Sequence, residues 1–169
     1  IWGAYRKDRP NWAAAGIASI PERADICYFP GCTASYVEHD IAQSTACLLR
    51  KAGVDFTYLG DDEACCGIPM LVAGLWDTFE EIMRHNIEAM KARGVKTVVT
   101  SCPACWLSWH TFYPDWAKKL GIEYAFEVKH YSEILADQIE KGAFRLDGEV
   151  PMKVTWHDSC HMGRAGNIY

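Results

Sequence analysis

The sequence predicts an α/β fold in which a mostly parallel sheet is flanked by helices. Short apolar runs alternate with longer stretches whose apolar residues recur at helical spacing, and this alternation is typical of parallel α/β sheets. Cysteines lie just past the ends of four of the expected strands. Because open α/β sheets build ligand sites at the carboxyl ends of their strands, the same pattern predicts a functional site at that edge.

Each expected strand is a short apolar run bounded by Gly, Pro or Asp, and the strands lie at residues 26–29, 55–59, 96–100, 124–128 and 152–156. Helices are expected at residues 36–52, 70–93, 103–120 and 132–141. Pro114 can break the third of these helices. In the first helix, Val37, Ile41, Leu48 and Ala52 recur at helical spacing and are expected to face the core.

The composition fits one ordinary domain with a proper core. The chain has 169 residues, of which 50% are hydrophobic, and a formal net charge of −5, so nucleic acid is not an expected partner. The sequence has no run of 18 apolar residues, so no membrane-spanning helix is expected. It shows no signal peptide, so the cysteines are expected to be reduced thiols or metal ligands rather than disulfides. The chain reads as a fragment. Residues 1–25 are expected to be a linker arm, 26–150 a cysteine-rich domain and 151–169 the start of a truncated second domain.

Five cysteines form the most informative motif, namely Cys32, the Cys65-Cys66-Gly67 triplet, and the Cys102-Pro103-Ala104-Cys105 segment. Counted on the sequence, 32 residues separate Cys32 from Cys65, and 35 separate Cys66 from Cys102. Five thiols are one more than a tetrahedral zinc needs, and they are enough to hold a polynuclear iron–sulfur centre. Adjacent thiolates can reach different irons of one cluster, and Gly67 would let the backbone approach it.

Two alternative interpretations, neither of which involves an iron–sulfur cluster, apply to parts of this motif. A strand followed by Cys-Pro-Ala-Cys at the start of a helix also fits a thioredoxin-like dithiol, although the other three cysteines argue against it. A structural zinc site is a second alternative, and the fifth cysteine argues against that one.

Other cysteines and aromatic residues are expected to have structural roles. Cys27 lies inside a predicted strand and Cys47 inside a predicted helix, so both are expected in the core as small apolar residues. An unusually aromatic run is expected to be a packed helix face, and it comprises Trp106, Trp109, His110, Phe112, Tyr113 and Trp116.

The five-cysteine pattern resembles the cysteine-rich CCG domain of the B and D subunits of heterodisulfide reductase. The resemblance covers roughly residues 26–145, and members of the family usually carry two such domains in tandem. It implies that Cys32, Cys65, Cys66, Cys102 and Cys105 hold a noncubane [4Fe-4S] cluster. The sequence also resembles the heterodisulfide reductase D-like subunits of membrane complexes associated with sulfite reductase. The implied reaction is two-electron cleavage or formation of a disulfide.

The resemblance also implies partners and a location. The substrate would be a low-molecular-weight heterodisulfide or a trisulfide on a small sulfur-carrier protein. The chain would be a cytoplasmic part of a membrane-bound redox complex, peripheral to the membrane through other subunits. An electron-transfer module that serves a flavin dehydrogenase for lactate, glycolate or glycerol-3-phosphate is the alternative function.

The segment from His157 to Arg164 resembles the opening of the second domain, where Cys160 would correspond to Cys32. Histidine titrates near neutral pH, so His157 and His161 are candidates to protonate a departing thiolate, and His130 is a candidate to line the site. Asp158 would orient a histidine or cap a helix. Cys160 is a third candidate catalytic residue, and it either belongs to the second site or lies near the first as a non-ligand.

Overall fold

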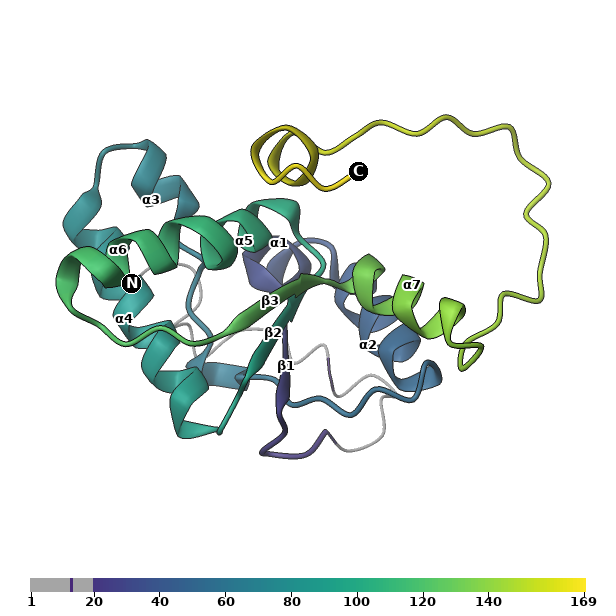
Figure 1. The fold of residues 1–169 in the computed structure, drawn as a ribbon, viewed down its shortest axis with the longest axis horizontal. Coiled ribbons are helices and arrows are strands. Elements are labelled where there is room, and N and C mark those ends of the chain that lie inside the picture. Colours follow the sequence, from purple (N-terminus) through teal and green to yellow (C-terminus); the bar gives the residue numbers. More distant parts are fainter. Residues whose placement is uncertain (1–12, 14–19) are drawn as a thin grey trace.

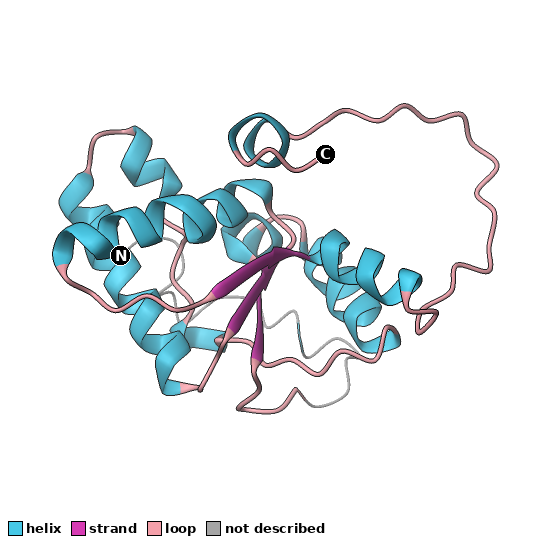
Figure 2. Ribbon diagram, in the orientation of Figure 1, coloured by secondary structure: helices cyan, strands magenta, loops and turns pink. Residues whose placement is uncertain are grey.

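The structure is a computed structural model and describes residues 13 and 20–169. Three parallel strands form its sheet in the order β1-β2-β3, which confirms the predicted α/β class (Figures 1 and 2). The strands are β1 (Ile26–Phe29), β2 (Thr97–Thr100) and β3 (Glu127–His130). The register places Phe29 beside Thr100 and Thr100 beside His130, so all three strands end at one edge.

The helices connect and cover these strands. Their bounds are α1 (Gly31–Tyr36), α2 (His39–Lys51), η2 (Gly60–Asp62), α3 (Ile68–Val72), α4 (Trp76–Ala92), α5 (Pro103–Leu107), η3 (Ser108–Phe112), α6 (Tyr113–Leu120), α7 (Tyr131–Glu140) and η4 (Cys160–Ala165). Within the described residues, no helix is long and apolar enough to cross a membrane.

One face of the sheet packs against α4 and the α5–α6 region. Alternate strand residues Cys27, Phe29 and Val98 contribute to this core, together with Met83 of α4 and Trp109 of η3. Trp106, Trp109 and Tyr113 are fully buried, which confirms that the aromatic run is a packed helix face.

The other face packs against α1, α2 and α7. Tyr28 and Val99, which alternate with the residues of the first face, meet Leu49 of α2 and Ile134 of α7 there. The sheet therefore lies between two helical layers, and Figure 1 shows α4 and α2 on its opposite sides.

Two predicted strands are not strands of this sheet. At residues 55–59, only an isolated parallel bridge between Cys27 and Thr57 forms, with two backbone hydrogen bonds of 2.8 and 2.9 Å between Thr57 and β1. Residues 152–156 are exposed and extended with no strand partner in the described part of the chain, and Figure 2 shows them within a long loop. The alternation of apolar residues there predicts a strand, but the described residues offer no sheet edge beside it.

Two of the predicted helices are interrupted or altered, for identifiable reasons. Gly74 adopts a φ of 77° between α3 and α4. The third predicted helix continues through a π-helical stretch just before Pro114, which has no N–H to donate to the preceding turn.

Cys47 is exposed rather than buried, so its assignment to the core is wrong. The set of residues expected to face the core is only partly right. Ala52 is buried and Leu48 is partly buried, but Val37, which precedes α2, and Ile41 are 71% and 43% exposed. Small residues on the other side of the helix, Ala42 and Ala46, are fully buried instead. These alanines pack beside Leu49 in the same core, so the size of an apolar residue did not show which residues of α2 are buried. Cys27 is fully buried in β1 as predicted.

Most of the linker arm expected at residues 1–25 lies outside the described residues. Residues 20–25 lead directly into β1, and the Lys96 and Thr97 N–H groups donate to the Asp25 carbonyl at 2.8 and 2.9 Å.

Candidate metal centre

The carboxyl ends of the strands bring the cysteine-bearing segments together. Cys32 lies in α1, directly after β1 and the turn at Pro30-Gly31. Cys102 follows β2 as the N-cap of α5, and Cys105 lies in the first turn of that helix, with Pro103 at its start. Cys65 and Cys66 lie in the loop between η2 and α3.

The five sulfurs form one continuous group. Side-chain hydrogen bonds join Cys32 to Cys65, Cys65 to Cys66, Cys66 to Cys105, and Cys105 to Cys102. These residues come from three segments of the chain, and the fold brings their side chains into contact as the sequence predicts. Their role as ligands stays a prediction.

A cavity of about 140 Å³ lies over this group. Its lining includes four of the cysteines, Cys32, Cys66, Cys102 and Cys105. Cys66 and Cys105 are buried, whereas Cys32 and Cys102 are half-buried. The centre is therefore enclosed on the side of the sheet and accessible from the side of Cys32 and Cys102.

Two of the thiols are disposed to ionise. A hydrogen bond from Cys105 lowers the pKa of Cys66 to about 5, with further help from Cys65 and the backbone of Ile68. A hydrogen bond from Cys105 also lowers the pKa of Cys102 to about 6, and the backbone N–H groups of Cys105 and Ala104 add to the effect. The thiolate is the form of cysteine that binds metals, so these two sulfurs are ready ligands at neutral pH.

The other three thiols hold their protons in the chain without metal. Hydrogen bonds to Cys102 and Cys66, followed by burial, raise the pKa of Cys105 well above its usual value. The hydrogen bond to Cys65 and burial raise the pKa of Cys32. At Cys65, the hydrogen bond from Cys32 lowers the pKa, but the hydrogen bond to Cys66 and burial outweigh it and raise the pKa to about 11. Metal binding at this group would therefore release protons.

Two glycines have distinct roles in the site. Gly67 adopts a φ of 82°, and a Cβ there would lie 2.7 Å from the ring of Phe79. Its N–H also donates to the Cys65 sulfur at 3.5 Å. Gly31 packs closely against another sulfur, because a Cβ there would lie 2.7 Å from the Cys105 Sγ atom.

Three buried polar side chains hold the backbone next to the cysteines. The Asn86 side chain in α4 accepts a hydrogen bond from the Ala64 N–H at 3.1 Å and donates one to the Cys65 carbonyl at 2.9 Å. The Ser108 hydroxyl donates to the Cys66 carbonyl at 2.6 Å. The Glu63 carboxylate accepts from the Gly31 N–H at 3.1 Å. No sequence motif indicated these three residues, which we call the polar frame.

The donor set fits a polynuclear iron–sulfur centre better than a single ion. Within residues 13 and 20–169, no group of three or more His, Cys, Asp or Glu side chains is arranged to hold one metal ion. The sulfurs instead form an extended chain. In a cluster, separate thiolates bind separate irons, and such clusters use soft thiolate ligands of this kind.

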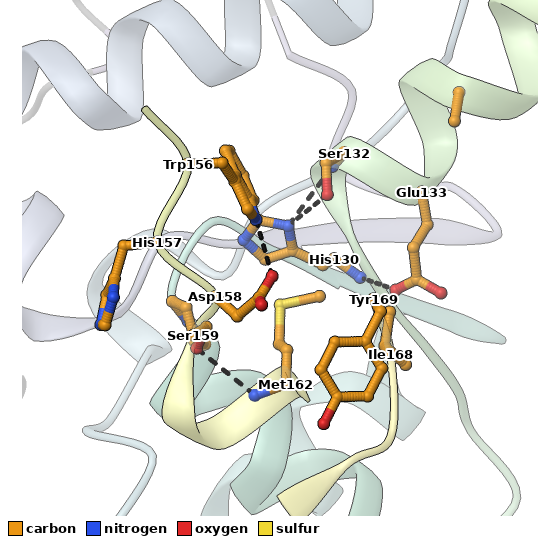
Figure 3. A pocket seen from close by; sticks show the side chains of 12 residues that line it. His130, Ser132, Glu133, Trp156, His157, Asp158, Ser159, Met162, Ile168 and Tyr169 are labelled. Atoms are coloured by element: carbon orange, nitrogen blue, oxygen red, sulfur yellow. Dashed lines mark hydrogen bonds between the residues drawn. The ribbon is translucent and has the colours of Figure 1, made fainter. Parts of the chain in front are cut away.

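A second and larger cavity has a volume of about 440 Å³, and Figure 3 shows the side chains that line it. Pro103 forms part of its wall, while the neighbouring Cys102 and Ala104 line the cysteine cavity. His130 at the end of β3 lies in this wall, with its Nδ1 atom 2.7 Å from the Ser132 Oγ atom. Burial lowers the pKa of His130, so its imidazole is neutral at neutral pH.

The C-terminal segment supplies the opposite wall of the larger cavity, with His157 and Asp158 among its residues. Asp158 accepts a hydrogen bond from the Trp156 indole at 2.8 Å. The N-cap of η4 is Ser159 rather than Asp158, and the Ser159 side chain accepts from the Met162 N–H. Cys160 is exposed, and neither Cys160 nor His161 lines either of these cavities.

The chain is similar to a cysteine-rich domain family and to several redox proteins. Residues 26–108 match the family model of the cysteine-rich CCG domain. The D subunit of dihydromethanophenazine:CoB–CoM heterodisulfide reductase from Methanosarcina mazei is 39% identical over 167 residues, which are 97% of this chain and 40% of that protein. An EtfAB:quinone oxidoreductase from Syntrophomonas wolfei is 33% identical over 178 residues, which are 99% of this chain and 24% of that protein.

An uncharacterized iron–sulfur protein from Methanocaldococcus jannaschii is 28% identical over 148 residues, which are 88% of this chain and 28% of that protein. No solved structure matches the chain. The chain thus spans about 40% of the length of its heterodisulfide reductase relative. Residues 26–108 thus match the cysteine-rich CCG domain, and nearly the whole chain is homologous to part of the D subunit of heterodisulfide reductase, an oxidoreductase.

Proposed function

We propose that Cys32, Cys65, Cys66, Cys102 and Cys105 hold a noncubane [4Fe-4S] cluster, and that the protein to which this domain belongs cleaves or forms a disulfide. The contact of these five sulfurs, four of which line one cavity, carries the proposal. When bound, the cluster supplies single-electron transfer. Reduction of a disulfide takes two electrons and two protons and releases two thiols, so the site must also deliver protons.

The half-buried positions of Cys32 and Cys102 favour catalysis over electron relay alone. A centre that only relays electrons needs no opening for a substrate, whereas disulfide chemistry needs a path for the sulfur substrate. Here the buried Cys66 and Cys105 would anchor the cluster, and the side near Cys32 and Cys102 would admit a small sulfur compound. His157 lines the adjacent cavity and is the better placed of the two candidate proton donors, while His161 and Cys160 are supported only by the sequence.

A larger redox complex is the proposed context. The substrate would be a low-molecular-weight heterodisulfide or a trisulfide on a sulfur-carrier protein. The domain would lie in the cytoplasm and be attached to the membrane through other subunits. The similarity to an EtfAB:quinone oxidoreductase favours a second candidate, an electron-transfer domain that serves a flavoprotein dehydrogenase.

Anaerobic purification with iron and sulfide analysis tests the cluster, and a brown protein that contains four irons and four sulfides is expected. A colourless protein with one zinc would overturn the proposal. Disulfide-reductase turnover of the full-length protein separates the two candidates, because a pure relay domain would show none. Turnover is then compared in the His157→Ala, His161→Ala and Cys160→Ser variants. If all three retain turnover and cluster spectrum, none of these residues is catalytic.

A further inference from the structure

We propose that Asn86 and Ser108 are positioning residues that set the geometry of the Cys65–Cys66 loop for its metal, an inference that rests on the proposed cluster. Asn86 is fully buried in α4 and lies on an otherwise apolar face beside Met83, Ile87 and Met90. Burying an amide side chain among such residues is unfavourable unless its polar atoms are hydrogen-bonded. The partners of Asn86 therefore indicate what it is for.

Asn86 uses both ends of its amide on the cysteine loop. The Ala64 N–H donates to its oxygen, and its nitrogen donates to the Cys65 carbonyl at 2.9 Å and to the Tyr113 hydroxyl at 3.0 Å. These bonds fix the peptide groups on both sides of the Ala64–Cys65 link. Aspartate would have nearly the same shape, but its carboxylate would have no donor for the Cys65 carbonyl.

Ser108 fixes the next peptide group from another element. Its hydroxyl lies at the start of η3, is fully buried, and donates to the Cys66 carbonyl at 2.6 Å. Adjacent carbonyls of the loop are thus held from α4 and from η3. Because Cys105 lies three residues before Ser108 in the same helical segment, the bond also ties the Cys66 loop to the element that carries another sulfur.

Hydrogen bonds to the residues that bind a metal strongly affect how tightly the metal is held. Removing one partner of a ligand typically weakens metal affinity about 10- to 100-fold. Here the hydrogen bonds reach the ligand backbone rather than the sulfur. The loop must nevertheless present two neighbouring sulfurs in different directions, and a change in either peptide plane would turn both side chains.

The test compares the full-length proteins carrying Ser108→Ala, Asn86→Ala and Asn86→Asp with a matched control, Thr57→Val. The Thr57 hydroxyl is also fully buried and donates to a backbone carbonyl, that of Glu22 at 3.0 Å, but Thr57 pairs with β1 beside Cys27, which is not one of the five cysteines of the site. Iron retention is titrated against a chelator, and the spectrum and midpoint potential of the reduced cluster are recorded. Thermal unfolding of all variants shows how much stability each has lost.

The expected result is an iron affinity about 10- to 100-fold lower in Ser108→Ala and Asn86→Ala, with altered cluster spectra. Asn86→Asp should also have a more negative midpoint potential, because an added buried negative charge favours the oxidised cluster. Thr57→Val should keep wild-type iron affinity and spectrum, even where its stability falls equally.

Wild-type affinity and spectra in both Ser108→Ala and Asn86→Ala would overturn the positioning role and leave the cluster itself intact. If Asn86→Ala does not fold, the Ser108→Ala variant alone tests the positioning role, because it removes a single hydroxyl and is the smaller change to the fold. Absence of iron from the wild-type protein would instead overturn the proposed function, and the positioning role with it.

Discussion

Gly31 packs against the sulfur of Cys105 so closely that a Cβ atom on Gly31 would lie 2.7 Å from Sγ. Gly31 also adopts a φ of 76°, a left-handed conformation that residues with a Cβ rarely occupy. The loop that carries Cys32 is thus tied to the helix that carries Cys105 by a contact only glycine allows.

Replacing Gly31 with Ala should therefore reduce both stability and iron content. Left-handed strain costs roughly 1–2 kcal/mol, and overpacking against the sulfur adds about 1–3 kcal/mol. Gly53→Ala is the matched control, because Gly53 has a φ of 72° but no atom within 4 Å of the added Cβ. Chemical unfolding and iron analysis check this. Equal losses in the two variants would show that the contact with Cys105 is unimportant.

Replacing cysteines one at a time should separate ligands from structural cysteines. Cys66→Ser and Cys105→Ser should lose iron and lower the free energy of unfolding of the metal-loaded protein, because a bound metal stabilises the folded state. Cys27→Ser should retain iron but cost about 1–3 kcal/mol, as expected for a buried hydroxyl without a good partner. Cys47→Ser should change neither the iron content nor the free energy of unfolding by a measurable amount, because Cys47 is exposed. Iron loss in the Cys47 variant would contradict these assignments.

The sequence predicted the fold class and the meeting of the five cysteines for one reason. Cys32 and Cys102 come directly after apolar strands, and parallel strands end at the same edge. The pattern of hydrophobic residues was less informative about which residues are buried, because burial depends on the elements that pack beside them. Cys47 and Ile41 carry an apolar signal but lie on the exposed side of α2, and residues 152–156 alternate like a strand without one beside them in the described part of the chain.

The polar frame was missed because its members belong to elements distant in sequence from the cysteines they hold. Asn86 is 21 residues from Cys65, and Ser108 is 42 residues from Cys66. A usable signal was nevertheless present for Asn86, which interrupts the apolar face formed by Phe79, Met83 and Met90. A polar residue on the buried face of an amphipathic helix needs a partner, but only the tertiary fold shows which one.

Cys102 should be a reactive thiolate at neutral pH in protein from which iron has been removed under reducing conditions. Its pKa is lowered to about 6 by the hydrogen bond from Cys105, and it is only half-buried. The rate of alkylation by iodoacetamide should be constant above about pH 7. It should fall about tenfold by pH 5, because the protonated thiol is unreactive. Mass spectrometry of the peptide containing Cys102 measures the rate. A rate that still rises between pH 7 and 9 would show that the pKa is not lowered.

The C-terminal segment should detach from α5 when Gly166 is replaced by Ala. A Cβ on Gly166 would overlap the ring of Trp106, a fully buried ring that packs with Met162 of η4. Because the ring is enclosed and cannot move aside, the segment must shift instead. Gly148→Ala is the control, since an added Cβ there has no atom within 4 Å and Gly148 precedes the same segment.

Hydrogen–deuterium exchange measures this detachment. Backbone N–H groups of residues 160–168 should exchange faster in Gly166→Ala than in Gly148→Ala, while exchange in β1, β2 and α4 should be unchanged. The Asn167 and Ile168 N–H groups are informative reporters, because they donate to the Gly163 and Met162 carbonyls at 2.7 and 3.0 Å. Since Met162 and Ile168 also line the larger cavity beside His130, the same variant should open that cavity. Unchanged protection of both reporters would show that η4 is not held in place by its contact with Trp106.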